Sequence, residues 1–189
     1  MCIRDRTGMA LAASVTIREA DPADAGAIAA IYNDAVTGTT AVWNLTPVDA
    51  ANRAAWMEGR QAAGYPVLVA TDAGRAVLGY ASFGDWRAFD GYRFTVEHSV
   101  YVRADVRGGG IGAALLTALI DRARALGKHV MVAGIAAENT GSIRLHERMG
   151  FRQTGHLPQV GAKFGRWLDL AFLQLELDDR PAPGPDPAP

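Results

Sequence analysis

Apolar residues recur at helical spacing near the start of the chain. They follow Asp21-Pro22, a pair that combines an N-cap residue with a proline suited to a first helical turn. The apolar positions that share one face are Ile28, Ile31 and Tyr32. This pattern predicts a short strand over Val15 to Arg18 and then a helix that runs to about Val36.

A second start signal follows the loop from Thr37 to Leu45. Thr46-Pro-Val-Asp49 offers an N-cap residue, a proline for the first helical position and an acidic partner three residues after the cap. It predicts a second helix that ends near Ala63.

The middle of the chain has the pattern of strands. The runs Val67 to Thr71 and Ala76 to Phe83 flank the turn-rich segment Asp72-Ala-Gly-Arg75, which predicts a hairpin. The segment Phe94 to Val102 is predicted as a further strand of an antiparallel meander.

A β-α-β crossover is predicted next. Between Gly110 and Leu126, the apolar residues Leu115, Leu116, Leu119, Ile120 and Ala123 lie at helical spacing. The unbroken apolar run His129 to Ile135 is typical of a strand that is buried on both faces.

The last third of the chain predicts one short helix and two strands. Asn139 is suited to cap a helix that runs to Met149 and ends at Gly150. Strands are predicted over Phe151 to Gly155 and Trp167 to Leu177, with a long loop between them from Gly155 to Arg166. The predicted order is therefore β-α-α-β-β-β-α-β-α-β-β.

Composition limits the class of protein. The chain has 189 residues, is 49% hydrophobic and carries a formal net charge of −1, which fits one globular domain and gives no electrostatic case for nucleic-acid binding. Cys2 is the single cysteine, so no internal disulfide is possible and no zinc spacing is present. No apolar run is long enough to span a membrane. We therefore expect a cytoplasmic protein without a resident metal.

The two ends of the chain differ from the middle. Residues 1–13 are expected to form a disordered N-terminal extension, with Met9 as an alternative initiator. Residues 180–189 are rich in proline and alanine and are expected to form a disordered tail, because they cannot pack a core. The folded domain is expected to span residues 14–179.

The candidate chemistry begins at a basic, glycine-rich turn. The strand that ends at Val102 leads into Arg107-Gly-Gly-Gly-Ile-Gly112, which opens the crossover helix. Such a turn suits a pyrophosphate, although a tight connection is the commoner explanation of its glycines. The basic residues after it argue against a dinucleotide fold, and the Walker pattern is absent.

The turn resembles the acetyl-CoA signature of the GCN5-related N-acetyltransferases, through Arg107, Gly110 and Gly112. Further segments resemble the phosphinothricin acetyltransferase branch of this family, and most of all its enzymes for L-methionine sulfoximine and L-methionine sulfone. These segments are Tyr32-Asn33, Thr39-Thr40-Ala41, Trp43, Gly84-Asp85-Trp86-Arg87, Thr95-Val-Glu-His-Ser-Val-Tyr-Val102, Arg144-Leu-His-Glu147, Gly150-Phe151 and Lys163-Phe-Gly-Arg-Trp-Leu-Asp169. The resemblance implies a single α/β domain with a mixed, mostly antiparallel central sheet and helices on both faces.

The resemblance also implies a set of residues for the co-substrate acetyl-CoA. Backbone groups of Val100, Tyr101 and Val102 would contact pantetheine, with an N–H near Val100 facing the oxyanion of the reaction. Asn139 would contact pantetheine or a water, or would only cap its helix. The pyrophosphate would be held by Arg107 and by the backbone of Gly108, Gly109, Gly110, Ile111, Gly112 and Ala113.

Two side chains are candidates for proton transfer. Glu97 shares a strand face with Thr95, Ser99 and Tyr101, and would accept the proton of the substrate amine directly or through a water. His146 stands where the wider family has a tyrosine acid. It would protonate the thiolate, deprotonate the amine, or be a buried structural histidine.

An amino-acid substrate would bind through a third set of residues. Arg87 would pair with the substrate carboxylate. The remaining expected neighbours of the substrate are Ala88, Phe89, Glu97, His98, Ser99, Tyr32, Thr39, Trp43 and Lys163, with Arg166 near the polar end of the pocket.

The implied function is N-acetylation of the α-amino group of methionine sulfoximine, methionine sulfone or phosphinothricin, a detoxification linked to antibiotic or herbicide resistance. Unsubstituted amino acids are further possible acceptors. Two other functions stay open from the sequence: acetylation of protein N-termini or lysines, and a CoA-binding module without turnover. The loop Gly155 to Arg166 lies where members of the phosphinothricin acetyltransferase branch pair as dimers, so the resemblance implies a homodimer in which this loop helps to complete the partner's active site.

Overall fold

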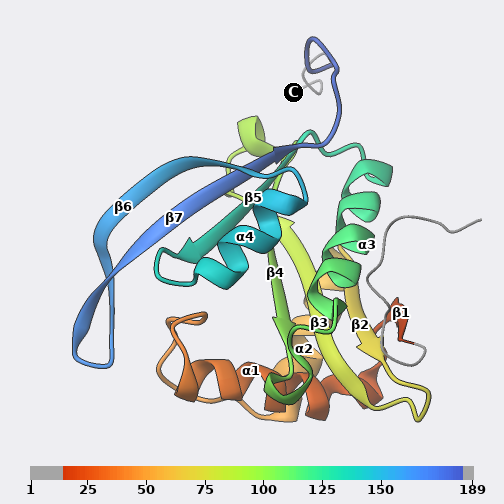
Figure 1. Cartoon of the computed structure of the whole chain (residues 1–189). Helices are drawn as coiled ribbons and strands as arrows, with labels where there is room; N and C mark the ends of the chain where they lie inside the picture. The colour runs from red at the N-terminus through yellow and green to blue at the C-terminus, as the bar shows by residue number, and fades with distance from the viewer. Residues whose placement is uncertain (1–14, 185–189) are drawn as a thin grey trace, which may run out of the picture.

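The computed structural model describes residues 15–184, so the predicted extension 1–13 and the last five residues lie outside the described part. Seven strands form one sheet (Figure 1). Their bounds are β1 Thr16–Glu19, β2 Val67–Thr71, β3 Val77–Asp85, β4 Thr95–Val102, β5 Val130–Ala136, β6 Arg152–Lys163 and β7 Arg166–Glu176. The spatial order is β1-β2-β3-β4-β5-β7-β6. Only β4 and β5 pair in parallel within this described sheet, so the predicted mixed, mostly antiparallel architecture is confirmed.

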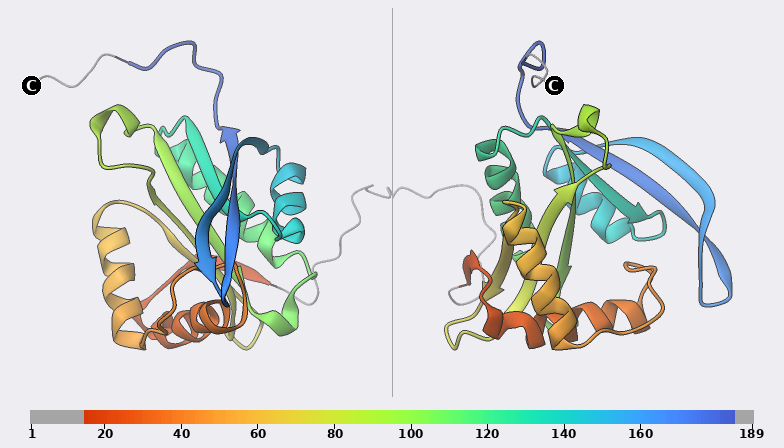
Figure 2. Two further views of the ribbon diagram at one scale, coloured as in Figure 1. Left: turned by 90° about the vertical axis from the view of Figure 1, so that its left-hand side faces the viewer. Right: turned by 180° about the vertical axis from the view of Figure 1, so that it is seen from behind.

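Helices cover both faces of the sheet (Figures 1 and 2). Their bounds are α1 Ala25–Gly38, α2 Ala50–Ala62, α3 Ile111–Ala125 and α4 Thr140–Arg148. Helices α1 and α2 lie on one face, and α3 and α4 lie on the other. The order of helices and strands agrees with the order that the sequence predicts.

Each face of the sheet buries its own apolar cluster. On the α3 side, Leu115, Leu116 and Leu119 are fully buried at the helical spacing that the sequence shows. On the α1 side, Ile28 and Tyr80 are buried in a second cluster. The sheet is therefore held between two apolar layers, and burial of this apolar area is the main stabilising contribution to the fold.

The second helix starts later than predicted. Asp49, and not Thr46, is its N-cap, and its Oδ1 accepts a hydrogen bond of 2.8 Å from the backbone N–H of Asn52. The reason lies on α1, because the side chain of Asn33 donates to the carbonyl of Val48 and accepts from its N–H. Val48 is thereby held outside the helix, and the chain turns into α2 only after it.

The predicted loop Gly155 to Arg166 is mostly strand instead. Strands β6 and β7 form a long hairpin that projects past the rest of the sheet in Figure 1. The turn is Phe164-Gly165, and both residues have positive φ, 53° and 73°, as tight hairpin turns require. Pro158 lies where the pairing shifts between Leu157 and Gly161, so the strand accommodates it.

Lys163 ties this hairpin to the first helix. Its side chain is buried, with 4% of the residue exposed. Its Nζ donates to the carbonyls of Ala35, Thr39 and Val42 at 3.4, 2.6 and 2.5 Å. The ammonium therefore satisfies carbonyl oxygens at the C-terminal end of α1, where the helix leaves acceptors unpaired.

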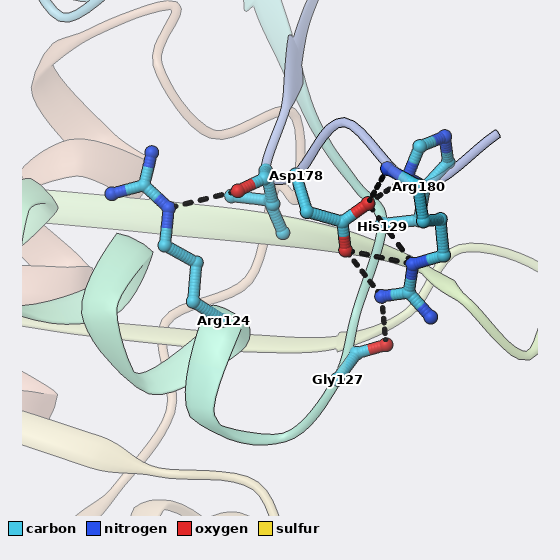
Figure 3. Close-up of polar contacts among 6 residues, drawn as sticks. Arg124, Gly127, His129, Asp178 and Arg180 are labelled. Atoms are coloured by element: carbon cyan, nitrogen blue, oxygen red, sulfur yellow. Dashed lines mark hydrogen bonds and ion pairs between the residues drawn. The ribbon is translucent and has the colours of Figure 1, made fainter.

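The segment from Leu177 to Arg180, which follows β7, is held by a group of polar contacts (Figure 3). Asp178 lies 2.7 Å from Nδ1 of His129 and accepts hydrogen bonds from Arg180, which keep the pKa of its carboxyl well below the usual range. Arg180 also donates to the carbonyl of Gly127, and Arg124 donates to that of Leu177. Arg180, the first residue of the predicted tail, is thus packed against the domain.

We predict that Lys163→Met lowers the free energy of unfolding by about 2 to 4 kcal/mol, because carbonyl acceptors near α1 lose a buried charged donor. Urea unfolding followed by circular dichroism measures this change. The control Arg152→Met removes an exposed ion pair with Glu176 and is expected to cost less than ~0.5 kcal/mol. Equal stability of the two variants would contradict a structural role for the lysine.

Candidate active site

A cavity opens where β4 and β5 separate. The two strands pair only from Thr95 to Glu97 on β4, opposite Val130 to Val132 on β5. Beyond these residues lies a cavity of about 1000 Å³. Of the predicted site residues, its walls contain Thr39, Val100, Tyr101, Val102, Arg107, Gly108, Gly110, Ile111, Gly112, Ala113, Asn139 and His146.

The glycine turn forms one end of this cavity. Gly108 and Gly110 have φ of 84° and 83°, a left-handed conformation that favours glycine. Helix α3 begins directly after Gly110, so its first N–H groups have no partner within the helix. The Nε of Arg107 donates to the carbonyl of Val102 at 3.1 Å. The turn therefore combines backbone donors and a cation, as an anion site requires.

Helix α4 forms another wall. The side-chain oxygen of Asn139 accepts from the N–H of Ser142 at 3.1 Å and caps the helix, so the predicted cap is confirmed. Asn139 also lines the cavity. Its side-chain oxygen is used in the cap, so its side-chain NH₂ group is the part that a ligand in the cavity can contact. A Cβ added to Gly112 would lie 3.3 Å from Leu145, so this glycine lets α3 and α4 approach closely.

Glu138 connects segments across the cavity mouth. Its carboxylate forms a bidentate pair with Arg166 at the start of β7, with both oxygens at 2.8 Å. It also accepts a hydrogen bond of 2.7 Å from Thr40, in the loop after α1. Glu138 itself lines the cavity, so this network fixes one of its rims. Arg166 is thus paired in the structure, and it lines neither this cavity nor its smaller neighbour.

Glu97 lies half-buried on the sheet face that carries α1 and α2. Its carboxylate reaches over Gly134, where an added Cβ would come within 3.1 Å of Oε1. Burial raises the pKa of the Glu97 carboxyl, and the nearby charges of Arg87 and Arg60 oppose this shift. A carboxyl with a raised pKa holds a proton more readily than an exposed one, as a general base must.

A smaller cavity joins this region to the large one. Its volume is about 90 Å³, and Val100, Tyr101, Asn139 and His146 belong to the walls of both. Its walls also contain the predicted residues His98 and Ser99, together with Gly134 beneath Glu97. Glu97 and Arg87 themselves line neither cavity, and the carboxylate lies beside the smaller one through its contact with Gly134.

His98 and His146 form a buried pair in that wall. Their Nε2 atoms are 3.2 Å apart, and the rings stack with an interplanar angle of 16°. The Nδ1 of His146 lies 2.7 Å from the carbonyl oxygen of Ser142 and must donate to it, because a carbonyl only accepts. His98 must then donate from Nε2 to Nε2 of His146.

This assignment leaves Nδ1 of His98 as an unprotonated acceptor. That atom is buried and has no hydrogen-bond partner within residues 15–184. Burial, reinforced by the neighbouring histidine, lowers the pKa of His98 to about 3, and burial also lowers the pKa of His146. Both rings are therefore neutral at pH 7, and both nitrogens of His146 are already engaged.

The loop after β3 carries the predicted carboxylate-binding residue. The guanidinium of Arg87 stacks on Trp86, 4.0 Å from the ring centroid, and donates to the Trp86 carbonyl. Against the effect of burial, the positive charge of Arg87 acts to lower the pKa of Glu97, which places the guanidinium near this carboxylate. Phe89 is 75% exposed, and Ala88 and Phe89 line neither cavity.

Besides Arg87, Glu97, Ala88 and Phe89, three other predicted substrate residues lie outside both cavities. Tyr32 is buried in the apolar cluster and meets Tyr101 edge-on at 6.3 Å between ring centroids. The ring of Trp43 packs over Gly161 of the hairpin, and Lys163 has its ammonium on three carbonyls. The structure therefore gives Tyr32, Trp43 and Lys163 packing contacts and brings none of them into the cavities.

One charged residue near Glu97 is missing from the sequence prediction. Arg60 of α2 reaches the sheet above Gly84, and its charge acts on Glu97. No local motif surrounds it, since it is one arginine on a polar helix. Only the register of β3 and β4, which pairs Gly84 with Glu97, shows that it belongs here.

Comparison with known proteins identifies the family. A profile described as the acetyltransferase (GNAT) family matches residues 27–151. The chain belongs to the GNAT acetyltransferases. The resemblance seen in the sequence is confirmed, and the chain is an enzyme of this family rather than a binding module.

Individual GNAT relatives are closely similar. An L-methionine sulfoximine/L-methionine sulfone acetyltransferase from Pseudomonas aeruginosa is 64% identical over 87% of this chain and 96% of its own length. A phosphinothricin N-acetyltransferase from Streptomyces coelicolor is 37% identical over 87% of this chain and 98% of its own. An acetyltransferase from Salmonella typhimurium, solved with its cofactor acetyl-CoA, has a TM-score of 0.88 at 60% identity and covers 90% and 98% of the two chains.

The cavity fits the co-substrate of a GNAT enzyme. The left-handed glycines and the first turn of α3 offer N–H groups to a pyrophosphate, and the unpaired edge of β4 offers backbone groups to an amide-bearing arm. Within residues 15–184, no group of three or more His, Cys, Asp or Glu side chains is arranged to hold a metal ion. In the same residues, no helix is long and apolar enough to cross a membrane.

We predict that nitrogen-15 NMR of histidine-labelled protein shows His98 as the Nε2–H tautomer and His146 as the Nδ1–H tautomer. His98 is expected to stay neutral from pH 7 down to pH 5, because its pKa of about 3 lies below the usual value near ~6.5. Burial disfavours protonation of His98 in the folded state but not in the unfolded state. The free energy of unfolding is therefore expected to fall as the pH drops below ~6.5, where the unfolded chain takes up the proton. A His98 resonance that titrates between pH 6 and 7 would contradict the paired geometry.

Proposed function

We propose that the chain transfers the acetyl group of acetyl-CoA to the α-amino group of L-methionine sulfoximine, L-methionine sulfone and phosphinothricin-type amino acids. The observation that carries this proposal is Glu97, a half-buried carboxyl of raised pKa that lies over Gly134 in the wall of the smaller cavity and feels the charges of two arginines. The name of the Pseudomonas relative supports the sulfoximine and sulfone in particular.

The binding residues follow from the cavity walls. Acetyl-CoA, when bound, supplies the acetyl group as a thioester. The backbone of Gly108, Gly110, Ile111, Gly112 and Ala113 would hold its pyrophosphate together with Arg107, and Gly109 completes the turn between them. The free edge of β4 at Val100, Tyr101 and Val102 would hold the pantetheine arm.

Glu97 would act on the amine. The C–N bond forms as nitrogen attacks the thioester carbonyl, and the C–S bond breaks as the thiolate leaves. An ammonium has a pKa several units above that of an ordinary carboxyl near ~4.3, so proton transfer to Glu97 is uphill. Burial of Glu97 narrows this difference, and a water between the two groups would complete the transfer.

A backbone N–H near Val100 would stabilise the oxyanion that develops on the carbonyl, because β4 lacks a strand partner at that point. For His146 we propose a role in shaping the cavity wall. Its Nδ1–H is held by Ser142 and its Nε2 by His98, so it has no free proton to give to the thiolate. The thiolate would then take its proton from water.

We further propose a cytoplasmic, detoxifying role, in which acetylation converts the amine of a glutamate or glutamine mimic into a neutral amide. The sequence has one cysteine and therefore needs no oxidising compartment to form internal disulfides. The net charge of −1 also gives no reason to expect a nucleic-acid partner.

The central test is Glu97→Gln, with thiol release measured on a panel of the two methionine analogues, phosphinothricin, the common amino acids and a lysine peptide. We expect kcat to fall ~10² to 10⁴-fold with unchanged acetyl-CoA affinity, because only the proton acceptor is lost. In the wild type, the rate should fall as the pH drops through the raised pKa of Glu97.

Glu58→Gln, an exposed carboxylate on α2, is the matched control and should keep wild-type activity. Turnover of the peptide alone would overturn the small-molecule proposal. Full activity of Glu97→Gln would remove Glu97 from the mechanism.

We also propose that the enzyme is a homodimer in which the β6–β7 hairpin packs against the partner. The support is apolar exposure on this projecting arm, since Val160, Phe164 and Trp167 are 51%, 56% and 67% exposed. A dimer would cover these side chains.

Light scattering coupled to size exclusion tests the dimer. We expect the wild type at twice the chain mass of 20.0 kDa, and Trp167→Glu at the monomer mass. Arg152→Glu, a charge change at the base of the arm, should leave the mass unchanged. A monomeric wild type would refute the dimer and leave the acetyltransferase proposal intact.

A further inference from the structure

The guanidinium of Arg60 occupies a space above the sheet that is open only because residue 84 is a glycine. Arg60 lies in the last turn of α2, and its guanidinium rests on the backbone of Gly84. A Cβ built on Gly84 would lie 1.3 Å from Nη1 of Arg60 and 2.5 Å from its Cζ. Any other residue at position 84 would therefore displace the guanidinium.

This position is next to the proposed base. Gly84 on β3 is the direct antiparallel partner of Glu97 on β4, so both face the same side of the sheet. Side chains in such pairs are separated by only ~5 Å at Cβ. The charges of Arg60 and Arg87 both act on Glu97, which places two cations around one carboxylate.

The guanidinium of Arg60 is not engaged within the protein. Within residues 15–184, it forms no ion pair or hydrogen bond, whereas the guanidinium of Arg18 is paired with Asp24 and that of Arg166 with Glu138. Glu97 itself is not within ion-pair distance of it. Its donors are therefore free for a ligand with planar oxygen acceptors.

The other side of Glu97 is apolar. Around the Cβ position of Gly134, Oε1 of Glu97 lies at 3.1 Å, Phe172 at 3.6 Å and Leu170 at 3.8 Å. Trp86 meets Phe172 edge-on at 5.3 Å between ring centroids. The surface around Glu97 thus has a cationic end over β3, at Arg60, and an apolar end over β5 and β7, at Leu170 and Phe172.

An α-amino acid matches this polarity in one orientation. With its amine at Glu97, its carboxylate would face the arginines and its side chain would face the apolar end. We propose that Arg60 is a specificity-determining residue that binds the acceptor's α-carboxylate together with Arg87. This inference rests on the proposed function, because it concerns the acceptor of the same reaction.

The test compares L-methionine sulfone with its carboxamide as acceptors, using kcat/KM for each. The wild type is expected to prefer the acid by ~10²-fold or more, since the amide leaves the arginines without an anion. In Arg60→Gln this preference should fall about tenfold or more, through KM of the acid, with unchanged acetyl-CoA affinity by calorimetry.

Two further variants separate binding from folding. Gly84→Ala keeps Arg60 but displaces its guanidinium, and should reduce the acid preference in the same way. Arg60→Lys keeps the charge without the planar fork and should fall between wild type and Arg60→Gln. Gly59→Ala, which adds a methyl group in open space one residue from Arg60, is the matched control and should keep the wild-type preference.

The outcomes are distinct. An unchanged acid preference in Arg60→Gln and Gly84→Ala would overturn the inference alone. The inference would also be overturned if Arg60→Gln lost its selectivity for the sulfone over methionine while keeping its preference for the acid over the carboxamide. Arg60 would then bind the sulfone group of the substrate side chain. A wild type that acetylates no amino acid would refute the proposed function, and the role of Arg60 with it.

Discussion

The separation of β4 from β5 is the constraint on which the rest of the site depends. Paired strands satisfy each other's backbone groups, and β4 gives up this pairing after Glu97. The free edge is tolerable only where water or a ligand can take the place of the missing strand. The glycine turn, the first turn of α3 and the capped start of α4 all lie around this opening, and each presents backbone donors or polar side chains to it.

Burial at this opening shifts the pKa of the carboxyl and the pKa values of the two histidines in opposite directions. It disfavours charge in both cases, so it raises the pKa of Glu97 and lowers the pKa of His98 and His146. A carboxyl that accepts a proton more readily therefore lies close to two imidazoles that resist one. In the proposed mechanism, Glu97 is therefore the group that takes up the proton released by the amine.

Local backbone chemistry could be predicted from the sequence, and contacts between distant segments could not. The glycine turn and the Asn139 cap were predictable because the residues that act there are neighbours in the chain. The sequence predicts a loop at 155–166, whereas the pairing shift in β6 accommodates Pro158 within a strand. Lys163 and Arg60 could not be placed, since their surroundings come from α1 and β3, and no periodicity records which carbonyls or which glycine they will meet.

The buried Lys163 connects the β6–β7 hairpin to the loop after α1, which belongs to the cavity wall. Lys163 joins the tip of β6 to the carbonyls of Thr39 and Val42, and Thr39 through Ala41 form part of the cavity wall. The Glu138 pair with Arg166 adds a second connection between the same arm and the same rim. A displacement of the arm would therefore disturb the contacts at the cavity mouth, and a rigid support for the arm would also help to hold the mouth in place.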